Sequence, residues 1–392
     1  MDSYNSTLAN GTVEEHCDGV LNLQFAAEDT ITRHLYSTPE KLIILTLYPI
    51  SLLIGLTGNF AFLAVVAFVP EMRTITNAYL GNLAVADILF LSALNYDVLM
   101  GYILSPIVKM KPYFSSFGCG FRICIQFTSH VTIVGLILLV TVERYLGICK
   151  PFKHRIVVAK GRTVKLILGA WSVGLMFSAL VIPNVAIFTK TCVIWPTTRK
   201  YDTFPGILRS CNPVIPVFGM FHDILLIPLL IVLLTTMIMY TRIIRNLNKR
   251  VSEVAGTGVT DARQVRNQVA RLLIATGTFF FFCCVPEFTL HFNKLILTVS
   301  NGDVGFKMTP KQQWYVVWLA RGMTTNSAVV NPIIYGLTNK RYRDAFKKLI
   351  TGKWMKRKMA ANLGSGLNQV TVSSKVNQSG SSTANINSQS NQ

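Results

Sequence analysis

Seven long apolar stretches constrain what this chain can fold into more than any other feature. A helix that crosses the hydrocarbon core of a bilayer needs about 20 mostly apolar residues. Two of the stretches, 42–69 and 166–188, contain no charged residue, and five others have few polar interruptions. The seven predicted spans are, in chain order, 42–69, 77–104, 117–149, 166–188, 214–240, 272–290 and 314–337. We therefore expect an all-α membrane protein, a seven-transmembrane helix bundle.

The composition of the chain excludes the common alternatives. Hydrophobic residues make up 51% of the 392 residues and charged residues only 14%, whereas soluble domains are about 25% charged. An ordinary soluble enzyme is therefore excluded, and a disordered chain needs low hydrophobicity. The net charge of +20 raises the possibility of a nucleic-acid partner, but nucleic-acid-binding domains are rarely this apolar. We expect no nucleic-acid partner.

The distribution of charge predicts the orientation. Seven spans put the termini on opposite sides, so the connecting segments alternate between the two sides. With the N-terminus outside, the inner segments hold 25 Lys and Arg against five acids, and the outer segments hold 11 against nine. Basic residues mark the cytoplasmic side and attract anionic membrane lipids. The predicted regions are an extracellular tail (1–40), the bundle (41–338), an amphipathic helix (339–352) and a disordered cytoplasmic tail (353–392).

Other features of the outer segments agree with this orientation. Two sequons, at Asn5 and Asn10, predict glycosylation of the N-terminal tail. Four cysteines fall on the outside: Cys17, Cys119, Cys192 and Cys211. Disulfides persist on that side of a membrane. A disulfide from Cys119, at the start of the third span, to either Cys192 or Cys211 would pin the second outer loop over the bundle.

Several short motifs occur in order along the spans. They are Gly58-Asn59, the segment 82–87 (Asn-Leu-Ala-Val-Ala-Asp), Glu143-Arg144-Tyr145, Trp171 and Asn331-Pro332-Ile333-Ile334-Tyr335. Cys119 precedes Arg144 by 25 residues. From about residue 40 to 350 the chain thus resembles the rhodopsin-class (class A) G-protein-coupled receptors. Within this class, the sequence as a whole is most similar to receptors for short neuropeptides. This group includes the thyrotropin-releasing-hormone, neuromedin U and FMRFamide receptors.

This resemblance implies a function and a set of partners. It implies a plasma-membrane receptor, not an enzyme, which binds an extracellular ligand and activates a heterotrimeric G protein. Receptor kinases and arrestin are the further partners that it implies, with 339–352 as the eighth helix of the family. The residues that it assigns to G-protein coupling and activation are Glu143, Arg144, Tyr145, Asn331, Pro332 and Tyr335.

A polar group is expected at the centre of the bundle. Asp87 is a carboxylate deep in an apolar span, where it needs partners, and the amides of Asn59 and Asn331 are the predicted ones. By resemblance this is a polar switch and a possible sodium site, to which Ser327 could contribute. Ile133 stands where the family usually offers a serine, which weakens the sodium interpretation. We expect no cofactor and no other metal.

The outer half of the bundle is the expected ligand site. Gln126 stands where amine receptors have an aspartate, and Thr325 stands where opsins have the retinal-binding lysine. Charged and polar residues inside a membrane are functional candidates. The candidate ligand-binding residues are Asp97, Arg122, Gln126, His130, Glu287 and Arg321, with His222 and Asp223 as weaker candidates.

Two interpretations of these candidate residues stay open. In the first, Glu287 and Asp97 meet a cationic group of the ligand, while Arg321 or Arg122 meets a carbonyl or acidic group. The acidic surplus inside the spans suits a basic or Arg-bearing peptide. In the second, Glu287 and Arg321 satisfy each other and have no role in binding.

Three positions depart from the family pattern. Arg266 stands where some relatives have an acid that holds Arg144, so we expect that contact to be absent and spontaneous opening to be easier. Cys284 replaces the usual tryptophan before Pro286, so Phe280 is expected to carry more of the packing switch. Thr236 stands where the fifth span usually has a tyrosine, and Tyr240 lies one turn further on.

Functions of other kinds would leave other features in the sequence. The ligand could be a non-peptide. A transporter or channel would need a continuous polar path or inverted repeats, and neither is visible. An intramembrane hydrolase would need a nucleophile with a base, and no such motif stands beside His130 or His222.

Overall fold

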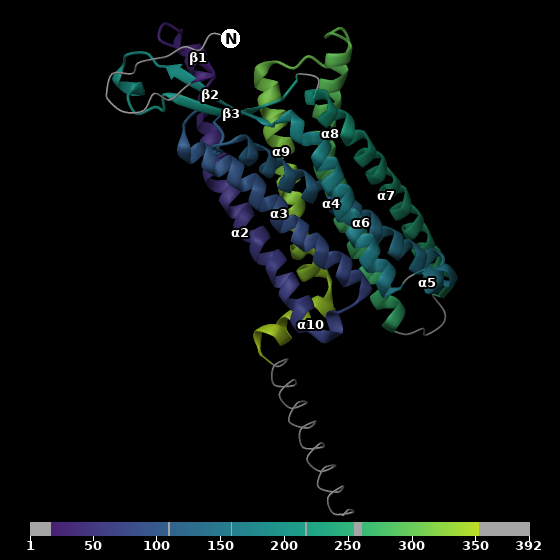
Figure 1. Ribbon diagram of the computed structural model, residues 1–392. Coiled ribbons are helices and arrows are strands. Elements are labelled where there is room, and N and C mark those ends of the chain that lie inside the picture. The colour runs from purple at the N-terminus through teal and green to yellow at the C-terminus, as the bar shows by residue number, and fades with distance from the viewer. Residues whose placement is uncertain (1–16, 109, 158, 216–217, 255–260, 353–392) are drawn as a thin grey trace, which may run out of the picture.

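The computed structural model describes residues 17–352 apart from 109, 158, 216–217 and 255–260. Within this part, seven long helices lie side by side as a bundle (Figure 1). They are α2 (Thr38–Phe68), α3 (Ile75–Leu104), α4 (Ser116–Cys149), α6 (Lys160–Val181), α7 (Phe218–Val254), α8 (Asp261–Val299) and α9 (Pro310–Thr338). Six are long and apolar enough to cross a membrane, and α9 completes the bundle by packing against α2 and α8. The predicted fold class is confirmed.

Local sequence signals set where the helices begin. At the start of α2, Ser37 and Glu40 form a capping box, and at the start of α9, Thr309 and Gln312 form another. Each box satisfies backbone N–H groups that have no partner inside the helix. Glu40 also accepts a hydrogen bond of 3.1 Å from Trp318 Nε1, which joins the first turn of α2 to α9.

The fourth span is shorter than its apolar run predicts. The run extends from 166 to 188, but α6 ends at Val181 and a 3₁₀ turn follows at Ile182–Asn184. Pro183 lies in this turn, and a proline cannot supply the N–H that a continuing helix needs. Residues from Ile187 onward enter a strand instead. The predicted end of this span, at 188, is therefore wrong by about two turns.

A three-stranded sheet covers one end of the bundle, called the sheet end below (Figure 1). Its strands are β1 (Gly19–Asn22), β2 (Ile187–Ile194) and β3 (Ile207–Asn212). β2 and β3 pair as an antiparallel hairpin in the connection between α6 and α7, and β1 pairs in parallel with β2. The last part of the predicted tail therefore belongs to the folded structure, together with the short helix α1 (Glu28–Thr32).

Two short helices lie at the opposite end, called the α10 end. They are α5 (Pro151–Val157), between α4 and α6, and α10 (Lys340–Ile350), directly after α9. The predicted amphipathic helix, 339–352, corresponds to α10. Tyr342 of α10 is buried and stacks on Phe62 of α2 with ring centroids 5.6 Å apart, so the apolar face of α10 packs under the bundle.

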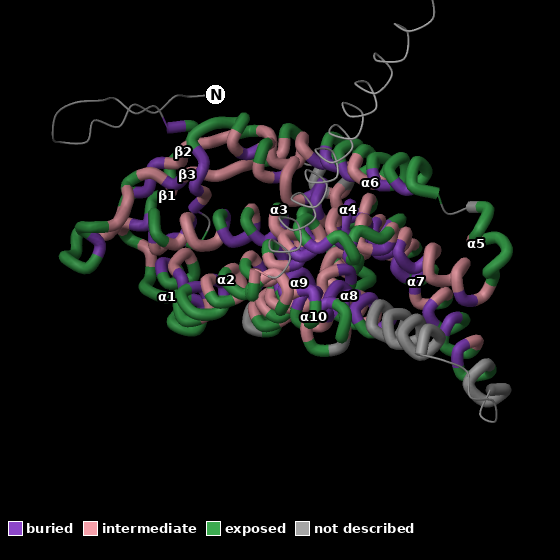
Figure 2. Tube along the Cα trace, turned by 90° about the horizontal axis from the view of Figure 1, so that it is seen from below, coloured by how far each residue is buried: buried purple, intermediate pink, exposed green. Residues whose placement is uncertain are grey.

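The burial pattern shows which helices are central (Figure 2). In the most apolar window of α4, 61% of the residues are buried, against 22% in α6 and 28% in α2. The outward faces of α2 and α6 instead expose leucine, isoleucine and phenylalanine. Such a ring of exposed apolar residues suits a lipid environment. Because α4 is the most buried of these helices, polar side chains that face it lie inside the bundle and away from lipid. These side chains are the candidates for ligand binding.

Candidate functional site

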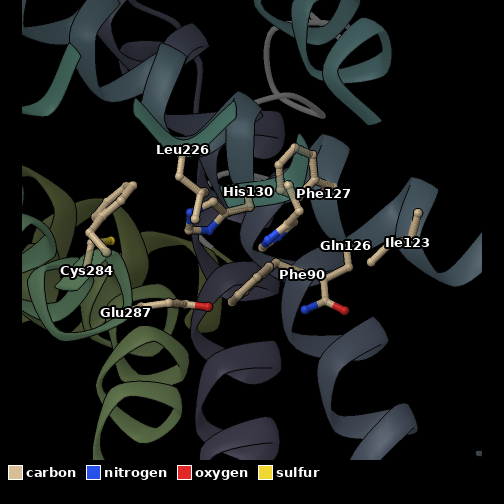
Figure 3. Close-up of a pocket in the computed structure, with 10 residues that line it drawn as sticks. Phe90, Ile123, Gln126, Phe127, His130, Leu226, Cys284 and Glu287 are labelled. Atoms are coloured by element: carbon tan, nitrogen blue, oxygen red, sulfur yellow. The ribbon is translucent and has the colours of Figure 1, made fainter. Parts of the chain in front are cut away.

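A small cavity of about 60 Å³ lies between α3, α4, α7 and α8 (Figure 3). Its lining residues are Phe90, Ile123, Gln126, Phe127, His130, His222, Leu226, Cys284, Glu287 and Phe288. The side chains of His130 and Glu287 approach the same space from different helices (Figure 3). The structure thus brings together three of the predicted ligand-binding residues, Gln126, His130 and Glu287.

The polar groups of this inner cavity are only partly satisfied. Gln126 Oε1 is buried and has no hydrogen-bond partner among the described residues. Glu287 Oε2 accepts a hydrogen bond of 2.5 Å from the Thr324 hydroxyl. The ring of His130 packs on Phe90 with centroids 5.5 Å apart. A buried acceptor without a partner is unfavourable, so a donor supplied from outside would be stabilised here.

A larger cavity of about 600 Å³ opens at the sheet end between α8 and α9. Glu287 lines both cavities and, among the described residues, is the only acid that lines this outer one. The other charged lining residues are the cations Lys294, Lys307 and Arg321. Within the described residues no ion pair joins Glu287 to Arg321. Glu287 and Arg321 therefore do not neutralise each other directly.

Asp97 and Arg122, two further predicted ligand-binding residues, are paired with each other. Asp97 Oδ2 lies 3.2 Å from Arg122 and 2.8 Å from Lys111 Nζ, while Oδ1 accepts a hydrogen bond of 3.2 Å from the Tyr113 hydroxyl. Burial lowers the pKa of Lys111, which the nearby carboxylate opposes, and burial raises the pKa of Tyr113. Asp97 belongs to α3 and is 7% exposed, while Lys111 and Tyr113 lie in the loop before α4. These buried contacts therefore hold the loop against α3.

Another carboxylate, Asp223 of α7, is surrounded by His222, which was a weaker candidate, and by two residues that the sequence did not single out, His291 and Lys294. Its Oδ1 lies 2.6 Å from His291 Nδ1 and 3.4 Å from His222 Nδ1, and its Oδ2 lies 3.0 Å from Lys294 Nζ. His291 and Lys294 both belong to α8. The spacing of Glu287 and His291, one helical turn, was the available signal that both face the bundle.

Two disulfides tie the sheet to the bundle and to the N-terminal segment. Of the two partners left open for Cys119, the structure joins it to Cys211, and Cys192 pairs with Cys17. The first disulfide fixes β3 to the start of α4, and the second fixes the segment before β1 to β2. Together they hold the sheet at the mouth of the helix bundle.

Of the two amide partners predicted for Asp87, the structure shows a hydrogen bond to Asn331, whereas the hydrogen bonds described for Asn59 go to backbone carbonyls. Asn331 Nδ2 donates to Asp87 Oδ2 at 2.8 Å, and Asn59 donates to the carbonyls of Gly55 and Ala328 at 2.9 and 3.2 Å. Asp87 is fully buried, and its Oδ1 has no partner among the described residues.

The surroundings of Asp87 were also tested for a sodium ion. The Ser327 hydroxyl donates to the Thr324 carbonyl at 2.6 Å, and the buried Ile133 offers no oxygen. Asp87 Oδ1 is the oxygen of this group that has no hydrogen-bond partner among the described residues, and the sodium site stays a prediction.

A close approach of α2 and α9 brings Pro332 beside Gly58. A Cβ atom on Gly58 would lie 2.7 Å from Pro332 Cγ. Glycine at this position lets α2 and α9 come together next to Asn59 and Asn331. Tyr335, three residues further along α9, is buried and packs on Phe62 with ring centroids 5.3 Å apart.

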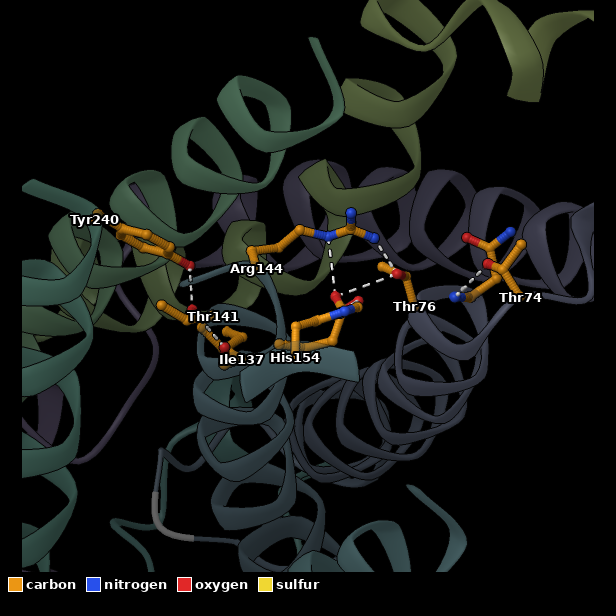
Figure 4. A network of polar contacts seen from close by, with 9 residues as sticks. Thr74, Thr76, Ile137, Thr141, Arg144, His154 and Tyr240 are labelled. Atoms are coloured by element: carbon orange, nitrogen blue, oxygen red, sulfur yellow. Dashed lines mark hydrogen bonds and ion pairs between the residues drawn. The ribbon is translucent and has the colours of Figure 1, made fainter. Parts of the chain in front are cut away.

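Arg144 forms a polar network at the α10 end (Figure 4). Its Nε lies 3.0 Å from Glu143 Oε2, and its terminal nitrogen donates to the Thr76 hydroxyl of α3. Thr76 in turn lies 3.3 Å from Glu143, and His154 of α5 lies 3.5 Å from the other Glu143 oxygen. Tyr145 packs beside a buried cluster built around Ile148 and Tyr240. The network joins α3, α4 and α5.

The departures from the family pattern have structural consequences. Tyr240 is buried, and its hydroxyl lies 2.9 Å from that of Thr141 in α4. Phe280 is among the largest fully buried side chains, and Cys284 is buried beside the inner cavity. A thiol is much smaller than an indole, so Cys284 leaves room at the floor of that cavity.

Some expectations lie outside the described residues. They concern Asn5 and Asn10 in the N-terminal tail, the side chain of Arg266, and the tail 353–392.

Comparisons with known proteins agree with this architecture. Residues 58–335, most of the chain, match the family described as 7 transmembrane receptor (rhodopsin family). The chain is 26% identical to the thyrotropin-releasing hormone receptor of Gallus gallus, over 92% of this chain and 90% of the relative. It is 23% identical to the motilin receptor of Homo sapiens, over 76% and 78%. With the somatostatin receptor type 5 of Rattus norvegicus it shares 24% identity, over 79% and 78%.

The family match spans the helices that carry both cavities, the Asp87 group and the Arg144 network. The matched family is a family of receptors and not of enzymes. This chain therefore belongs to the rhodopsin family of seven-transmembrane, G-protein-coupled receptors.

Proposed function

We propose that the ligand of this receptor is a short extracellular peptide, which binds where the two cavities meet at Glu287. Membership of the family implies an extracellular ligand and a G protein; the peptide is our proposal. The observation that carries it is the position of Glu287, a carboxylate that lines both cavities and forms no ion pair among the described residues. Its charge is available to a ligand.

The charges around Glu287 suggest the chemistry of the peptide. A cationic or strongly donating group at the inner end would meet Glu287 and the free acceptor of Gln126. A carbonyl or carboxylate further out would meet Arg321, which lines the outer cavity. Asp97 and Arg122 leave the proposed contact set because they neutralise each other. The aromatic rings of Phe90, Phe127 and Phe288 would supply apolar contact.

The size of the site and the relatives also favour a peptide. A cavity of about 600 Å³ is within the range of ligand-binding pockets. The relatives reported above are named as receptors for thyrotropin-releasing hormone, motilin and somatostatin, which are peptides. The sheet at the mouth of the bundle offers further polar backbone surface for a chain longer than the cavity.

We place the sheet end outside the cell and the α10 end in the cytoplasm. Both disulfides lie at the sheet end, and disulfides persist in an oxidising compartment. The basic residues of α5 and α10 lie at the other end, where positive charge marks the cytoplasmic side. In this orientation the Glu287 cavities face the ligand, and Arg144 faces the G protein, arrestin and receptor kinases.

Signalling follows from the position of Glu287 next to Pro286. An agonist that binds the active arrangement more tightly than the resting one shifts the population toward the active arrangement. Pro286 removes one backbone hydrogen bond from α8, so the helix can bend beside the ligand. Movement of the α10 end of α8 away from α4 would then open a surface next to Arg144 and Tyr240, where a G protein binds and exchanges its nucleotide.

The test begins with a screen of amidated and free peptides, with calcium and cyclic AMP readouts. Against the peptide that responds, Glu287→Gln and Arg321→Gln are compared at matched surface expression. A charged hydrogen bond contributes about 1.5–3 kcal/mol, so each variant should lower agonist potency by roughly ten- to 100-fold. Asp303→Asn is the matched control, because it removes an exposed charge between α8 and α9 that lines neither cavity.

Two results would contradict the proposal. One is a response confined to amines or lipids. The other is an agonist potency in Glu287→Gln that equals that of Asp303→Asn.

A further inference from the structure

Three side chains with metal-ligating atoms meet where α7 and α8 adjoin at the sheet end. They are His222 and Asp223 of α7 and His291 of α8, and their ligand atoms all lie within 4.8 Å of one another. In the part of the chain that the structure describes, no other such group of three is found. We propose that this His–Asp–His site binds a transition-metal cation of the Zn²⁺ type.

The spacing of the atoms is close to that of a tetrahedral zinc site. Zinc takes imidazole nitrogen and carboxylate oxygen at about 2.0–2.2 Å, which puts neighbouring ligand atoms about 3.3 Å apart. Asp223 Oδ1 already lies 3.4 Å from His222 Nδ1 and 2.6 Å from His291 Nδ1. The two imidazole rings have centroids 4.7 Å apart. Small side-chain rotations would therefore bring all three atoms onto one ion.

The neighbours of the site hold the ligands in place. Asp223 is 3% exposed, and its second oxygen, Oδ2, is fixed by Lys294 Nζ at 3.0 Å. Oδ1 is thus the oxygen left for an ion. The ring of His222 packs on Phe127 with centroids 5.4 Å apart. Contacts of this kind fix the orientation of metal ligands.

The donor set selects the class of cation. Imidazole suits zinc, copper and nickel, whereas calcium and magnesium take oxygen ligands. Three protein ligands leave a fourth position on zinc for water or another group. A bound ion would also join α7 to the segment of α8 that follows Pro286. His222 lines the inner cavity and His291 the outer one, both of which Glu287 also lines, but the metal proposal does not rest on the proposed peptide ligand.

The competing explanation is an ion-pair cluster without metal. In that case Lys294 and the two histidines simply neutralise Asp223, as the distances already allow. Such a cluster would show no saturable binding of Zn²⁺. Lys294 Nζ lies on Oδ2 of Asp223 and not on Oδ1, so it does not occupy the oxygen proposed for the ion.

The experiment uses the full-length receptor, purified into lipid nanodiscs and stripped of metal with a chelator. Zn²⁺ alone is titrated in competition with a fluorescent zinc indicator, which gives the stoichiometry and the dissociation constant. Co²⁺ is added in parallel, because its visible absorption reports ligand type and geometry. Variants His222→Gln, His291→Gln and Asp223→Asn are measured beside His34→Gln, which removes another histidine of the sheet end that belongs to no such group.

We expect one Zn²⁺ per wild-type receptor. Its affinity should fall at least about tenfold in each site variant and stay unchanged in His34→Gln. Magnesium should not compete. Absence of saturable binding, or equal affinity in the wild type and both histidine variants, would overturn the proposal. The two single histidine variants keep the test decisive even if Asp223→Asn fails to fold, because each leaves the Asp223–Lys294 pair in place.

Discussion

Asp97 and Glu287 are both carboxylates in apolar helices, yet their surroundings give them different roles. Asp97 lies within 3.2 Å of two cations, whereas Glu287 receives one neutral hydrogen bond and lines two cavities. A charge inside a membrane protein must be compensated. For Asp97 the chain itself supplies the compensation, and for Glu287 an added ligand can supply it.

Replacement of Asp97 tests this difference. Asp97→Asn leaves Arg122 and Lys111 without their counter-charge. Breaking a buried ion pair lowers stability by about 3–5 kcal/mol. Because the side chains of Lys111 and Arg122 are 33% and 18% exposed, we expect about 2–3 kcal/mol. The melting temperature of the purified receptor should fall by several degrees, with agonist potency per folded receptor little changed.

The matched control for Asp97 is an exposed ion pair of the same kind. Asp29→Asn breaks the pair with Arg33, whose side chains are 66% and 76% exposed, and exposed pairs contribute little. Its melting temperature should equal that of the wild type. An unchanged melting temperature in Asp97→Asn, together with a large loss of agonist potency, would contradict this role and show that Asp97 takes part in ligand binding.

The residues that the sequence located best are those whose chemistry demands a partner. Asp87 is one, and the structure supplies Asn331 at 2.8 Å. The partners of Asp97 were not predictable, because Lys111 lies in a loop whose path depends on packing between distant segments. The same holds for Asp223, since the register of α7 against α8 decides which histidine meets it.

At the scale of elements, the long helices were predictable and the sheet was not. A spanning helix leaves a run of about 20 apolar residues, so all seven spans were located, four of them (α2, α3, α4 and α9) near their observed bounds. The end of α6 was misplaced, and α7 and α8 extend well beyond the predicted 214–240 and 272–290. A strand in a loop, such as the eight residues of β2, leaves a far weaker signal. β1 pairs with β2 across more than 160 positions of the chain, a distance over which local patterns carry no information.

The Cys17–Cys192 disulfide, which joins the segment before β1 to β2, can be tested directly. We insert a specific protease site after Arg33, which is exposed and follows α1. After cleavage, the N-terminal fragment should stay attached to the receptor on a non-reducing denaturing gel, because Cys17 is bonded to Cys192. Reduction, or the variant Cys17→Ser, should release it. Release of the fragment from the oxidised wild type would show that this disulfide does not form.

The short helix α5 offers a contact surface at the α10 end. His154 holds α5 to Glu143 at 3.5 Å, while Phe152 on the same helix is 83% exposed. A large exposed aromatic side chain beside the Arg144 network fits a contact for the G protein. Aromatic residues at the centre of an interface often contribute 2 kcal/mol or more. Phe152→Ala should therefore lower G-protein coupling by at least about tenfold.

An aromatic residue at the opposite end supplies the control for Phe152. Phe25 is 90% exposed near the sheet, and Phe25→Ala should leave coupling unchanged. Surface expression is matched by labelling of the N-terminus in unpermeabilised cells. Equal coupling in Phe152→Ala and the wild type would exclude α5 from the G-protein contact.

Across the whole molecule, the charges in the connecting segments differ in role from the charges inside the helix bundle. The net charge of +20 is carried by connecting segments, and in the proposed orientation the excess lies on the cytoplasmic side. The charges inside the bundle are few, and most are paired within the chain. Among the described residues, Glu287 and Arg321 line the outer cavity without an ion pair. We propose that a peptide bound at Glu287 drives nucleotide exchange at the distant Arg144 end.

The most direct measurement is GTP-analogue binding to a purified G protein in the presence of the nanodisc receptor and the peptide found by screening. We predict that the peptide accelerates nucleotide exchange on the wild-type receptor, and that Glu287→Gln needs at least about tenfold more peptide for the same rate. Asp303→Asn should behave as the wild type. No acceleration by any peptide, or identical peptide dependence in Glu287→Gln and the wild type, would contradict the account.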